Sequence, residues 1–356
     1  MNEPKLPMLP PRADLESRAA LKQLARANRA LAELKGYAST IPNQHMLINA
    51  VMIKEAKDSS AIENIITTHD DLCRAMSNAG KASVAAKEVV SYREALWHGY
   101  QLVRTRHVLT TSMMIEIQEM IEKNTAGLRK LPGTVLRNEA TGEIVYTPPS
   151  TEHDIKQLLA NLETYINEDE DDVDHLIKLA VVHYQFEVIH PFYDGNGRTG
   201  RIVNVLYLVL KGLLESPILY LSSFIIRNKP AYYRLLQEVR THDKWEEWIL
   251  YILTGIEQTA TETLFLIRKI NQEAEAMSAE IQARLPKIYS QELMSLLFYE
   301  FYTKTHYIEK GLAVTRKTAV SYLSALEREG FLSSERIGKE RIYLNRRLYE
   351  LVKAGQ

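Results

Sequence analysis

The segment HPFYDGNGRTGR, residues 190–201, is strongly polar, yet it lies between two of the most apolar stretches of the chain. Residues 174–189 before it and residues 202–214 after it are apolar on most faces, which is typical of buried helices. Pro191 is expected to end the first helix, and the second is expected to begin near residues 196–198. Two buried helices joined in this way deliver a polar loop to a cleft in a mainly helical core.

The residue types of this loop predict an anion site. Gly195 and Gly197 are expected to allow positive φ angles and a close approach of a ligand to the backbone. Free N–H groups and the positive end of the second helix would face the cleft. Arg198 and Arg201 are three residues apart, so they share a helix face and are expected to reach successive phosphates.

An acid and a histidine extend the predicted site toward catalysis. A lone carboxylate beside phosphates, here Asp194, is the usual way in which a protein holds Mg²⁺. An imidazole that titrates near neutrality, here His190, can accept a proton from an incoming hydroxyl. The chemistry implied is nucleophilic attack on a nucleotide phosphate, and the alternative is a histidine that only caps its helix.

Residues 190–201 also match every specified position of the pattern H-P-F-x-D/E-G-N-G-R-x-x-R, and the chain therefore resembles the Fic family. The resemblance implies a protein adenylyltransferase that moves AMP from ATP to a Tyr, Ser or Thr hydroxyl of a target protein or of itself. It implies that His190 is the general base and that Asp194 binds Mg²⁺. It further implies ATP contacts along the rest of the motif, at Gly195, Asn196, Gly197, Arg198, Thr199, Gly200 and Arg201.

A second pattern of this family, S/T-x-x-x-E-G/N, is matched by Ser59, Glu63 and Asn64. The resemblance implies an N-terminal inhibitory helix whose Glu63 pairs with Arg201 and blocks the productive pose of the ATP γ-phosphate. One alternative is a capping box formed by Ser60 and Glu63, in which the glutamate only stabilises its own helix. Another is that Glu63 helps water to remove AMP from a modified protein.

Two further parts of the site are expected from the resemblance. The hairpin predicted over Thr134 to Thr147 resembles the flap that holds a target segment by strand addition, and its alternative is a purely structural hairpin. Asn228 and Tyr233 are expected to contact adenosine, since an amide and a stacked aromatic ring suit a purine. Tyr232 and Leu235 are expected to belong to the core.

The last part of the chain is basic, with 12 Lys and Arg against 8 Asp and Glu over residues 285–356. A helix over 291–305, a helix over 315–330 and a hairpin turning at Gly338 have the order of a winged helix-turn-helix, whose alternative is a protein-interaction or dimerisation module. In the DNA-binding interpretation, one group of residues enters a groove and another binds phosphates. The first group is Thr315, Arg316, Lys317 and Ser321, and the second is Arg336, Lys339 and Arg341.

The composition limits the class of protein. The chain has 356 residues, of which 46% are hydrophobic and 25% charged, as in folded proteins, and its net charge of −1 argues against overall electrostatic binding of nucleic acid. A single cysteine, Cys73, excludes a disulfide within the chain and fits a reducing compartment. No signal peptide or membrane span is visible, so we expect a cytoplasmic protein.

The expected organisation has three parts. Residues 1–105 form an N-terminal helical region with the inhibitory pattern, residues 106–280 the catalytic domain, and residues 285–356 the winged helix. A homodimer is a further expectation, because contact between two chains would regulate the inhibitory helix. The competing hypothesis is a DNA-binding regulator in which the catalytic core serves as a nucleotide sensor.

Overall fold

Helices make up most of the molecule, as the sequence predicts. The computed structural model describes residues 6–41, 44–76, 82–137, 142, 144–337 and 340–354, without the side chains of 44–47, 73, 137, 337 and 354. The N-terminal helices are α1 (Arg18–Ser39), α2 (Gln44–Ile62), α3 (His69–Met76), α4 (Val84–Arg106) and α5 (Thr111–Glu122). The central helices are α6 (Glu152–Asn167), α7 (His175–Ile189), α8 (Asn196–Leu210), α9 (Ser222–Arg227), α10 (Lys229–His242) and α11 (Trp245–Arg284).

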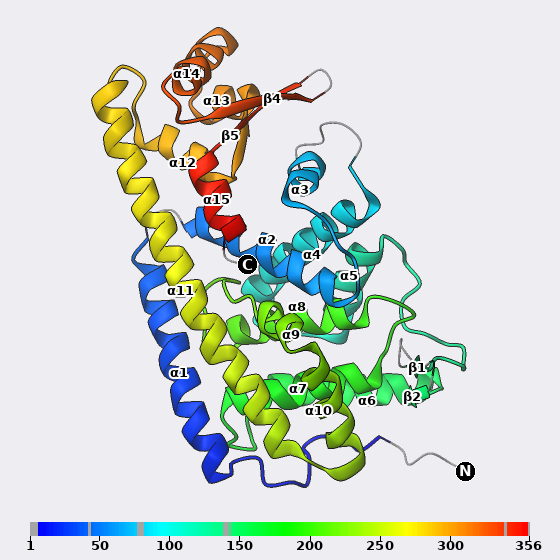
Figure 1. Cartoon of the computed structure of the whole chain (residues 1–356). Coiled ribbons are helices and arrows are strands. Elements are labelled where there is room, and N and C mark those ends of the chain that lie inside the picture. The colour runs from blue at the N-terminus through cyan, green and yellow to red at the C-terminus, as the bar shows by residue number, and fades with distance from the viewer. Residues whose placement is uncertain are drawn as a thin grey trace.

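The polar loop of residues 190–195 joins α7 to α8 in the middle of this bundle (Figure 1). Asp174 caps α7 by accepting a hydrogen bond from the N–H of Leu176 at 2.8 Å. Nearly every residue of α7 and α8 is buried. The predicted pair of buried helices is therefore confirmed, and it fixes both ends of the loop inside the core.

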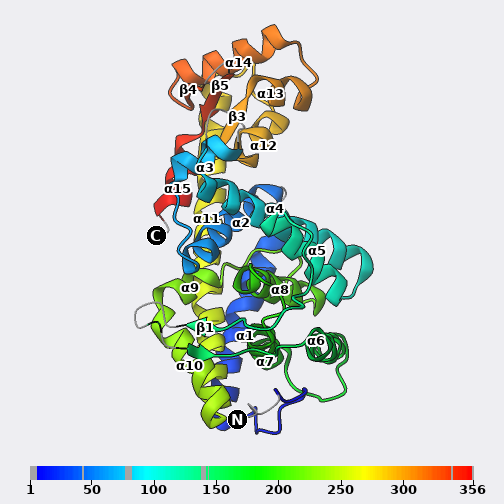
Figure 2. The same ribbon diagram turned by 90° about the vertical axis from the view of Figure 1, so that its right-hand side faces the viewer.

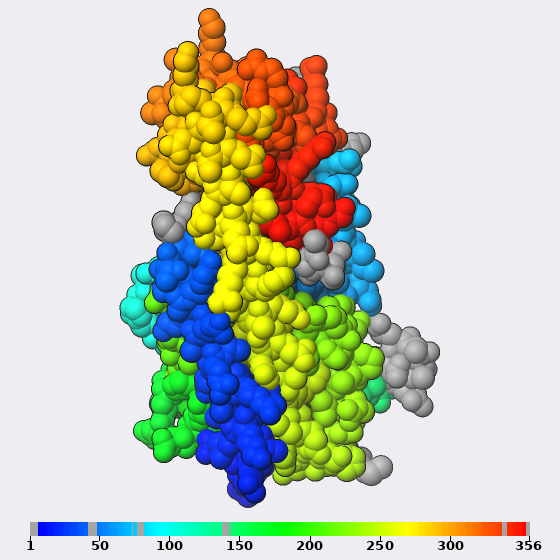
Figure 3. Space-filling model, turned by 60° about the vertical axis from the view of Figure 1, so that its left-hand side comes forward, coloured from blue at the N-terminus to red at the C-terminus, as the bar shows by residue number. Residues whose placement is uncertain are grey.

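A long helix pair supports one side of the bundle. The 40-residue helix α11 and the helix α1 run along each other, and both are visible on the surface shown in Figure 3. Trp248 of α11 is fully buried and donates its indole N–H to the Ala180 carbonyl of α7, as expected of a packing residue. Among the described residues, no helix has both the length and the apolarity needed to cross a bilayer.

The predicted hairpin is present as β1 (Leu136–Arg137) paired antiparallel with β2 (Ile144–Tyr146). Its connection, residues 138–141 and 143, lies outside the described residues. The Tyr146 hydroxyl donates to the Val188 carbonyl of α7 at 2.7 Å, and Arg240 of α10 donates to the Val145 carbonyl. The hairpin is thus attached beside the end of α7, next to the polar loop.

The C-terminal domain has a strand and two short helices, Tyr302–Lys304, Thr305–Gly311 and Arg346–Ala354, that the sequence did not predict. The helix expected over 291–305 ends at Tyr299, and residues Tyr302–Lys304 form a strand instead. This strand is buried and pairs with another, which satisfies its backbone better than a further helical turn would. The elements are α12 (Gln291–Tyr299), β3 (Tyr302–Lys304), α13 (Thr305–Gly311), α14 (Arg316–Arg328), β4 (Ser333–Ile337), β5 (Glu340–Leu344) and α15 (Arg346–Ala354).

These elements form an antiparallel sheet of order β3-β5-β4 covered by α12 to α14, the topology of a winged helix-turn-helix. The predicted hairpin is β4–β5, and its turn, with Gly338 and Lys339, lies outside the described residues. α14 ends before Gly330, whose φ of +82° suits a helix terminus.

The C-terminal domain packs against the helices that precede the catalytic region (Figure 2). Asn49 of α2 donates its side-chain N–H to the Tyr299 carbonyl at 2.9 Å. Arg93 of α4 forms an ion pair with Glu300, and both side chains are largely buried. The helix α2 therefore extends from the C-terminal domain to the middle of the bundle.

The acidic segment of residues 167–174 binds two lysines. Lys178 of α7 is almost fully buried and donates to the Glu168 carbonyl at 2.5 Å and to Asp171 at 2.9 Å. Lys211 donates to both oxygens of Asp169. The loop thus neutralises two lysines, and no cluster of metal-binding residues is found in the described ranges.

Candidate active site

The polar loop is closed on itself by Asn196. Its side chain accepts from the Phe192 N–H at 2.8 Å and donates to the Phe192 carbonyl at 2.9 Å. Phe192 is fully buried, so the loop is anchored in the core at its middle. The side chain of Asn196 therefore shapes the loop, while its backbone begins α8.

His190 lies at the end of α7 in the left-handed region, with φ 49°. Burial lowers the pKa of His190 to about 4, and the charge of Arg129 acts in the same direction. This differs from the titration near neutrality that the sequence suggested, because the sequence does not reveal how deeply the ring is buried. The imidazole is accordingly neutral at pH 7, as a proton acceptor must be.

Arg129 fixes the backbone on both sides of this histidine. Its Nε donates to the His190 carbonyl at 2.6 Å, and its Nη2 donates to the carbonyls of Ile189 and Pro149. The backbone N–H of Arg129 also donates to the Pro191 carbonyl. Its side chain is almost fully buried, so these contacts hold the histidine at one position relative to the loop.

The two glycines of the loop serve different purposes. Gly195 has a φ of +78° and stands at the N-cap of α8. Among the described residues, no side chain caps this end of the helix. Gly197 does not have the expected positive φ, because it lies within the first turn of α8. A methyl group at Gly197 would instead collide with Glu63 and Arg201, so this position needs glycine for its size.

Asp194 presents a single carboxylate at the mouth of the loop. Its side chain is 79% exposed, and one oxygen accepts the Gly195 N–H at 2.7 Å. Gln118 of α5 donates to its backbone carbonyl. One accessible carboxylate suits Mg²⁺ when phosphates and waters supply the other ligands, so the residues present fit the predicted metal.

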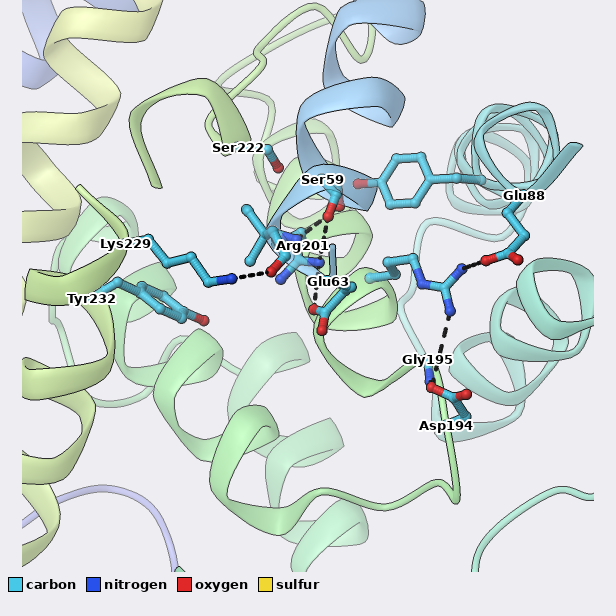
Figure 4. Close-up of polar contacts among 12 residues, drawn as sticks. Ser59, Glu63, Glu88, Asp194, Gly195, Arg201, Ser222, Lys229 and Tyr232 are labelled. Carbon is cyan, nitrogen blue, oxygen red and sulfur yellow. Dashed lines mark hydrogen bonds and ion pairs between the residues drawn. The ribbon is translucent and has the colours of Figure 1, made fainter. Parts of the chain in front are cut away.

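Arg201 is directed away from the loop mouth and toward the end of α2 (Figure 4). Its Nε donates to Ser59 Oγ at 2.7 Å, and its Nη2 donates to the Ser59 carbonyl and to Glu63 at 2.9 Å. Burial raises the pKa of Glu63, but the Arg201 charge and hydrogen bond outweigh burial and hold it below its ordinary value. The structure thus brings Ser59 and Glu63 to Arg201, which lies 142 and 138 residues further along the chain.

The end of α2 explains the third residue of the pattern. α2 ends at Ile62, and Asn64 follows with a φ of 62°. The N–H of Asn64 bonds the Ala61 carbonyl and that of Ile65 bonds the Ser60 carbonyl, which is the Schellman arrangement. Glu63 therefore lies past the C-terminal end of its helix, and the alternative of an N-terminal capping box is wrong.

Arg198 is engaged separately from Arg201. Its Nη2 donates to Glu122, the last residue of α5, at 2.6 Å, and its Nη1 donates to Glu88 of α4 at 3.3 Å. The Arg198 side chain is 5% exposed. The two arginines thus bind different acids from different segments of the chain, although they are neighbours on α8.

The remaining predicted contacts lie in different surroundings. Thr199 and Gly200 are buried within α8, and a methyl group at Gly200 would meet Glu187 of α7 at 2.7 Å. Asn228 was expected to contact adenosine through its side-chain amide. The N–H of this amide donates to the Phe224 carbonyl at 2.9 Å, so part of the amide is already engaged. Tyr233 is 47% exposed and accessible, and its role stays a prediction.

Tyr232 and Leu235 are buried, as expected of core residues. Three residues near the site were missed by the sequence analysis. Lys229 donates to the Ile62 carbonyl at 2.7 Å and so holds the last turn of α2. Arg129 holds the backbone at His190, and Glu122 binds Arg198. None has a sequence signal of its own, because each is a single charged residue outside the two patterns.

Family models match three stretches of the chain. A model described as the Fic/DOC family N-terminal region matches residues 21–101, and one described as the Fic/DOC family matches residues 108–208. The chain belongs to the Fic/DOC family. A model of the C-terminal domain of SoFic-like protein adenylyltransferases matches residues 274–348. The resemblance drawn from the motif is thereby confirmed.

Relatives and solved structures agree with this membership. A probable protein adenylyltransferase of Aquifex aeolicus is 27% identical over 216 residues, covering 56% of this chain and 60% of the relative. The protein adenylyltransferase Fic of Drosophila persimilis is 24% identical, covering 62% of this chain and 44% of the relative. The chain thus spans less than two thirds of the length of either.

The fold is also found in solved structures. A Fic family protein from Desulfovibrio desulfuricans aligns with a TM-score of 0.59 and 18% identity, covering 94% of this chain and 98% of that one. Fic-1 of C. elegans aligns with a TM-score of 0.54 and 18% identity, covering 70% and 74%. At this level of identity the likeness concerns the fold.

Proposed function

We propose that this protein is a protein adenylyltransferase, which transfers AMP from ATP to a side-chain hydroxyl of a protein and releases diphosphate. The observation that carries the proposal is a neutral, rigidly held His190 beside the uncapped N-terminus of α8. An uncapped helix start favours phosphate oxygens. The relatives named as protein adenylyltransferases support the same assignment.

In the proposed reaction the hydroxyl oxygen of the target attacks the α-phosphorus, and the bond to the diphosphate oxygen breaks. His190 takes the proton of the hydroxyl, for which its neutral state is suited. The backbone N–H groups at the start of α8 bind the phosphate oxygens and stabilise their charge. Asp194 would hold Mg²⁺, which supplies charge neutralisation on the phosphates when bound.

We propose in addition that Glu63 inhibits the transfer. Its carboxylate occupies the Arg201 guanidinium, which a nucleotide phosphate would otherwise bind. Ser59, Lys229 and the turn at Asn64 hold the end of α2 in place, so the inhibitory contact is well ordered. Release of Glu63 is expected to free one arginine for ATP.

The reverse activity is supported by the same contact. Glu63 is 36% exposed and lies against Gly197 in the first turn of α8, so its carboxylate could activate a water. That water would attack the phosphorus of an AMP-modified hydroxyl and release AMP. Removal of AMP from a pre-modified protein, lost in the Glu63→Gly variant, would distinguish this hydrolase from the transferase.

The experiment that tests the proposal is intact mass spectrometry after incubation with ATP and Mg²⁺. Wild type, Glu63→Gly and Glu63→Gly/His190→Ala are compared, first alone and then with a cell extract as the source of targets. An AMP-sized gain in the released variant, absent from the histidine variant, is expected. If correctly folded Glu63→Gly modifies nothing in either sample, the transferase assignment is overturned.

A second candidate function, binding of duplex DNA, is favoured by the exposed face of α14. Arg316 and Lys317 are exposed there and have no acidic partner among the described residues. The acids of the same segment are occupied, Glu327 by Arg341 and Glu329 by Arg284. Arg316 and Lys317 thus form a basic face on α14, and such a face suits a DNA groove. The helix lies at one end of the molecule (Figure 2).

Salt-dependent binding to a mixed duplex measures this function. The Arg316→Ala/Lys317→Ala variant is expected to lose affinity and to show a shallower dependence on salt concentration. The Arg26→Ala/Arg29→Ala variant removes the same charge from the exposed face of α1 and serves as the control. Equal behaviour of both variants would count against a DNA site on α14.

A further inference from the structure

Arg198 and Gly195 share a carboxylate that neither sequence pattern includes. Glu122 accepts from Arg198 Nη2 at 2.6 Å, and a methyl group at Gly195 would lie 2.7 Å from its Oε1. Its carboxylate is therefore in contact with the arginine and with the backbone at the start of α8. This is the region where the proposed function places phosphate.

The arrangement repeats that of Glu63. The Glu63 carboxylate contacts Arg201 and lies against Gly197, whereas the Glu122 carboxylate contacts Arg198 and lies against Gly195. The two acids come from different parts of the chain, because Glu63 directly follows α2 and Glu122 ends α5. Each of the two arginines of the motif is thus bound to an acid beside one of the two glycines.

We propose that Glu122 is a second inhibitory residue, which competes with the phosphates of ATP for Arg198 and for the start of α8. This proposal rests on the proposed nucleotide site. It predicts that release of Glu63 alone opens only one of two blocked arginines. Glu88, which Figure 4 shows, lies 3.3 Å from Arg198 and is more exposed than Glu122, so it is the weaker partner of the same guanidinium.

The charges around Glu122 favour competition over support. A residue that only oriented Arg198 would be expected beyond the guanidinium, on the side away from the loop. Glu122 instead approaches Gly195 itself, where its negative charge would repel a phosphate. Burial raises the pKa of Glu122, and the nearby charges of Asp194, Glu88 and Glu63 add to this although Arg198 opposes them. The carboxylate therefore stands among like charges and can be displaced.

Calorimetric titration with MgATP tests the proposal without requiring transfer. The parent is the Glu63→Gly/His190→Ala variant, which binds without turning over, and Glu122→Gln is added to it. We expect MgATP to bind at least about tenfold more tightly, equivalent to about 1.4 kcal/mol. The matched control is Glu119→Gln, one turn earlier on α5, which removes the same charge at the groove formed with His98 and Glu116.

Unchanged or weaker binding with Glu122→Gln would overturn competition, and weaker binding would make Glu122 a positioning residue for Arg198. Equal tightening by Glu119→Gln would also overturn it, because the effect would then come from net charge alone. Tighter binding without any protein modification in the active background would support the competition while refuting AMP transfer. Absence of MgATP binding in every folded variant would refute both.

Discussion

The motif region and the C-terminal domain both surround arginines with carboxylates, but they place these pairs in different environments. Arg198 and Arg201 of the motif are 5% and 3% exposed. Arg341 and Arg347 of the C-terminal domain are 54% and 33% exposed, although they make contacts of similar length. Proximity of opposite charges is therefore not what distinguishes the two regions.

The difference shows where the chain tolerates change. An exposed pair loses little when it is broken, because water solvates both partners. A buried charge that loses its partner is left without solvation. Another partner, such as a phosphate, must then take the place of the lost one. Buried arginines that are paired with acids beside a polar loop consequently indicate a binding site, whereas exposed pairs do not.

The largest effect is expected from Arg129→Met, which removes the guanidinium that holds the backbone at His190. Three carbonyls, of Pro149, Ile189 and His190, lose their donor. At about 1–3 kcal/mol for each unpaired buried group, the free energy of unfolding should fall by about 4 kcal/mol. Urea unfolding measures this, with Arg104→Met on the exposed face of α4 as control. Equal stability of both variants would contradict the clamp.

The next effect concerns Glu55 of α2, which is fully buried and accepts from the Tyr92 hydroxyl at 2.9 Å and the Ser222 N–H at 3.1 Å. Burial raises its pKa from 4.5 to about 7. Between these two values the folded state keeps a proton that the unfolded state loses. The protonated Glu55 therefore contributes fully to the free energy of unfolding below pH 4.5, and this contribution is lost as the pH rises to about 7.

Glu55→Gln stays neutral, so its stability relative to wild type should increase by about 3 kcal/mol between pH 4.5 and pH 7.5. Unfolding in urea at both pH values measures the change, and other titrating groups cancel in the difference. Glu292→Gln, on the exposed start of α12, is the control from the C-terminal domain and should show no such trend. A flat difference for Glu55→Gln would mean that the buried carboxyl is ionised throughout.

The sequence predicted the parts of this site that lie within short patterns. The loop between two buried helices, the start of α8 and the pairing of Glu63 with Arg201 were all expected, whereas the contact of Ser59 with Arg201 was not. Each of these features follows from local spacing or from the family resemblance. Both kinds of signal can be seen in short stretches of consecutive residues. The same holds for the hairpin and for the order of elements in the C-terminal domain.

The remaining features depend on contacts between distant residues. Glu122 lies 76 residues from Arg198, and Arg129 lies 61 residues from His190, with no pattern to connect them. The low pKa of His190 reflects burial by the surrounding helices, which no local spacing reveals. The strand Tyr302–Lys304 was missed because its partner β5 follows almost 40 residues later and decides its conformation.

A smaller effect is expected from Arg347→Ala. The Arg347 side chain joins α15 to α11. Both terminal nitrogens donate to Glu280, at 2.9 Å and 2.8 Å, in a two-point contact. Such a fork is stronger than a single bond, but water reaches both partners. We expect a loss of about 1 kcal/mol in the free energy of unfolding, measured with urea. A loss as large as that of Arg129→Met would remove the contrast between the two regions.

The smallest effect is expected from Arg341→Ala in the wing. Arg341 donates to Glu327 at 3.0 Å and to Ser334 at 2.7 Å, but more than half of its side chain is exposed. Its contribution should be below about 0.5 kcal/mol, and added salt should not change the difference from wild type by more than that amount. Thermal unfolding at low and high salt tests both statements. A large, salt-sensitive loss would show that the wing charges form a network, and exposure alone would then no longer separate the two regions.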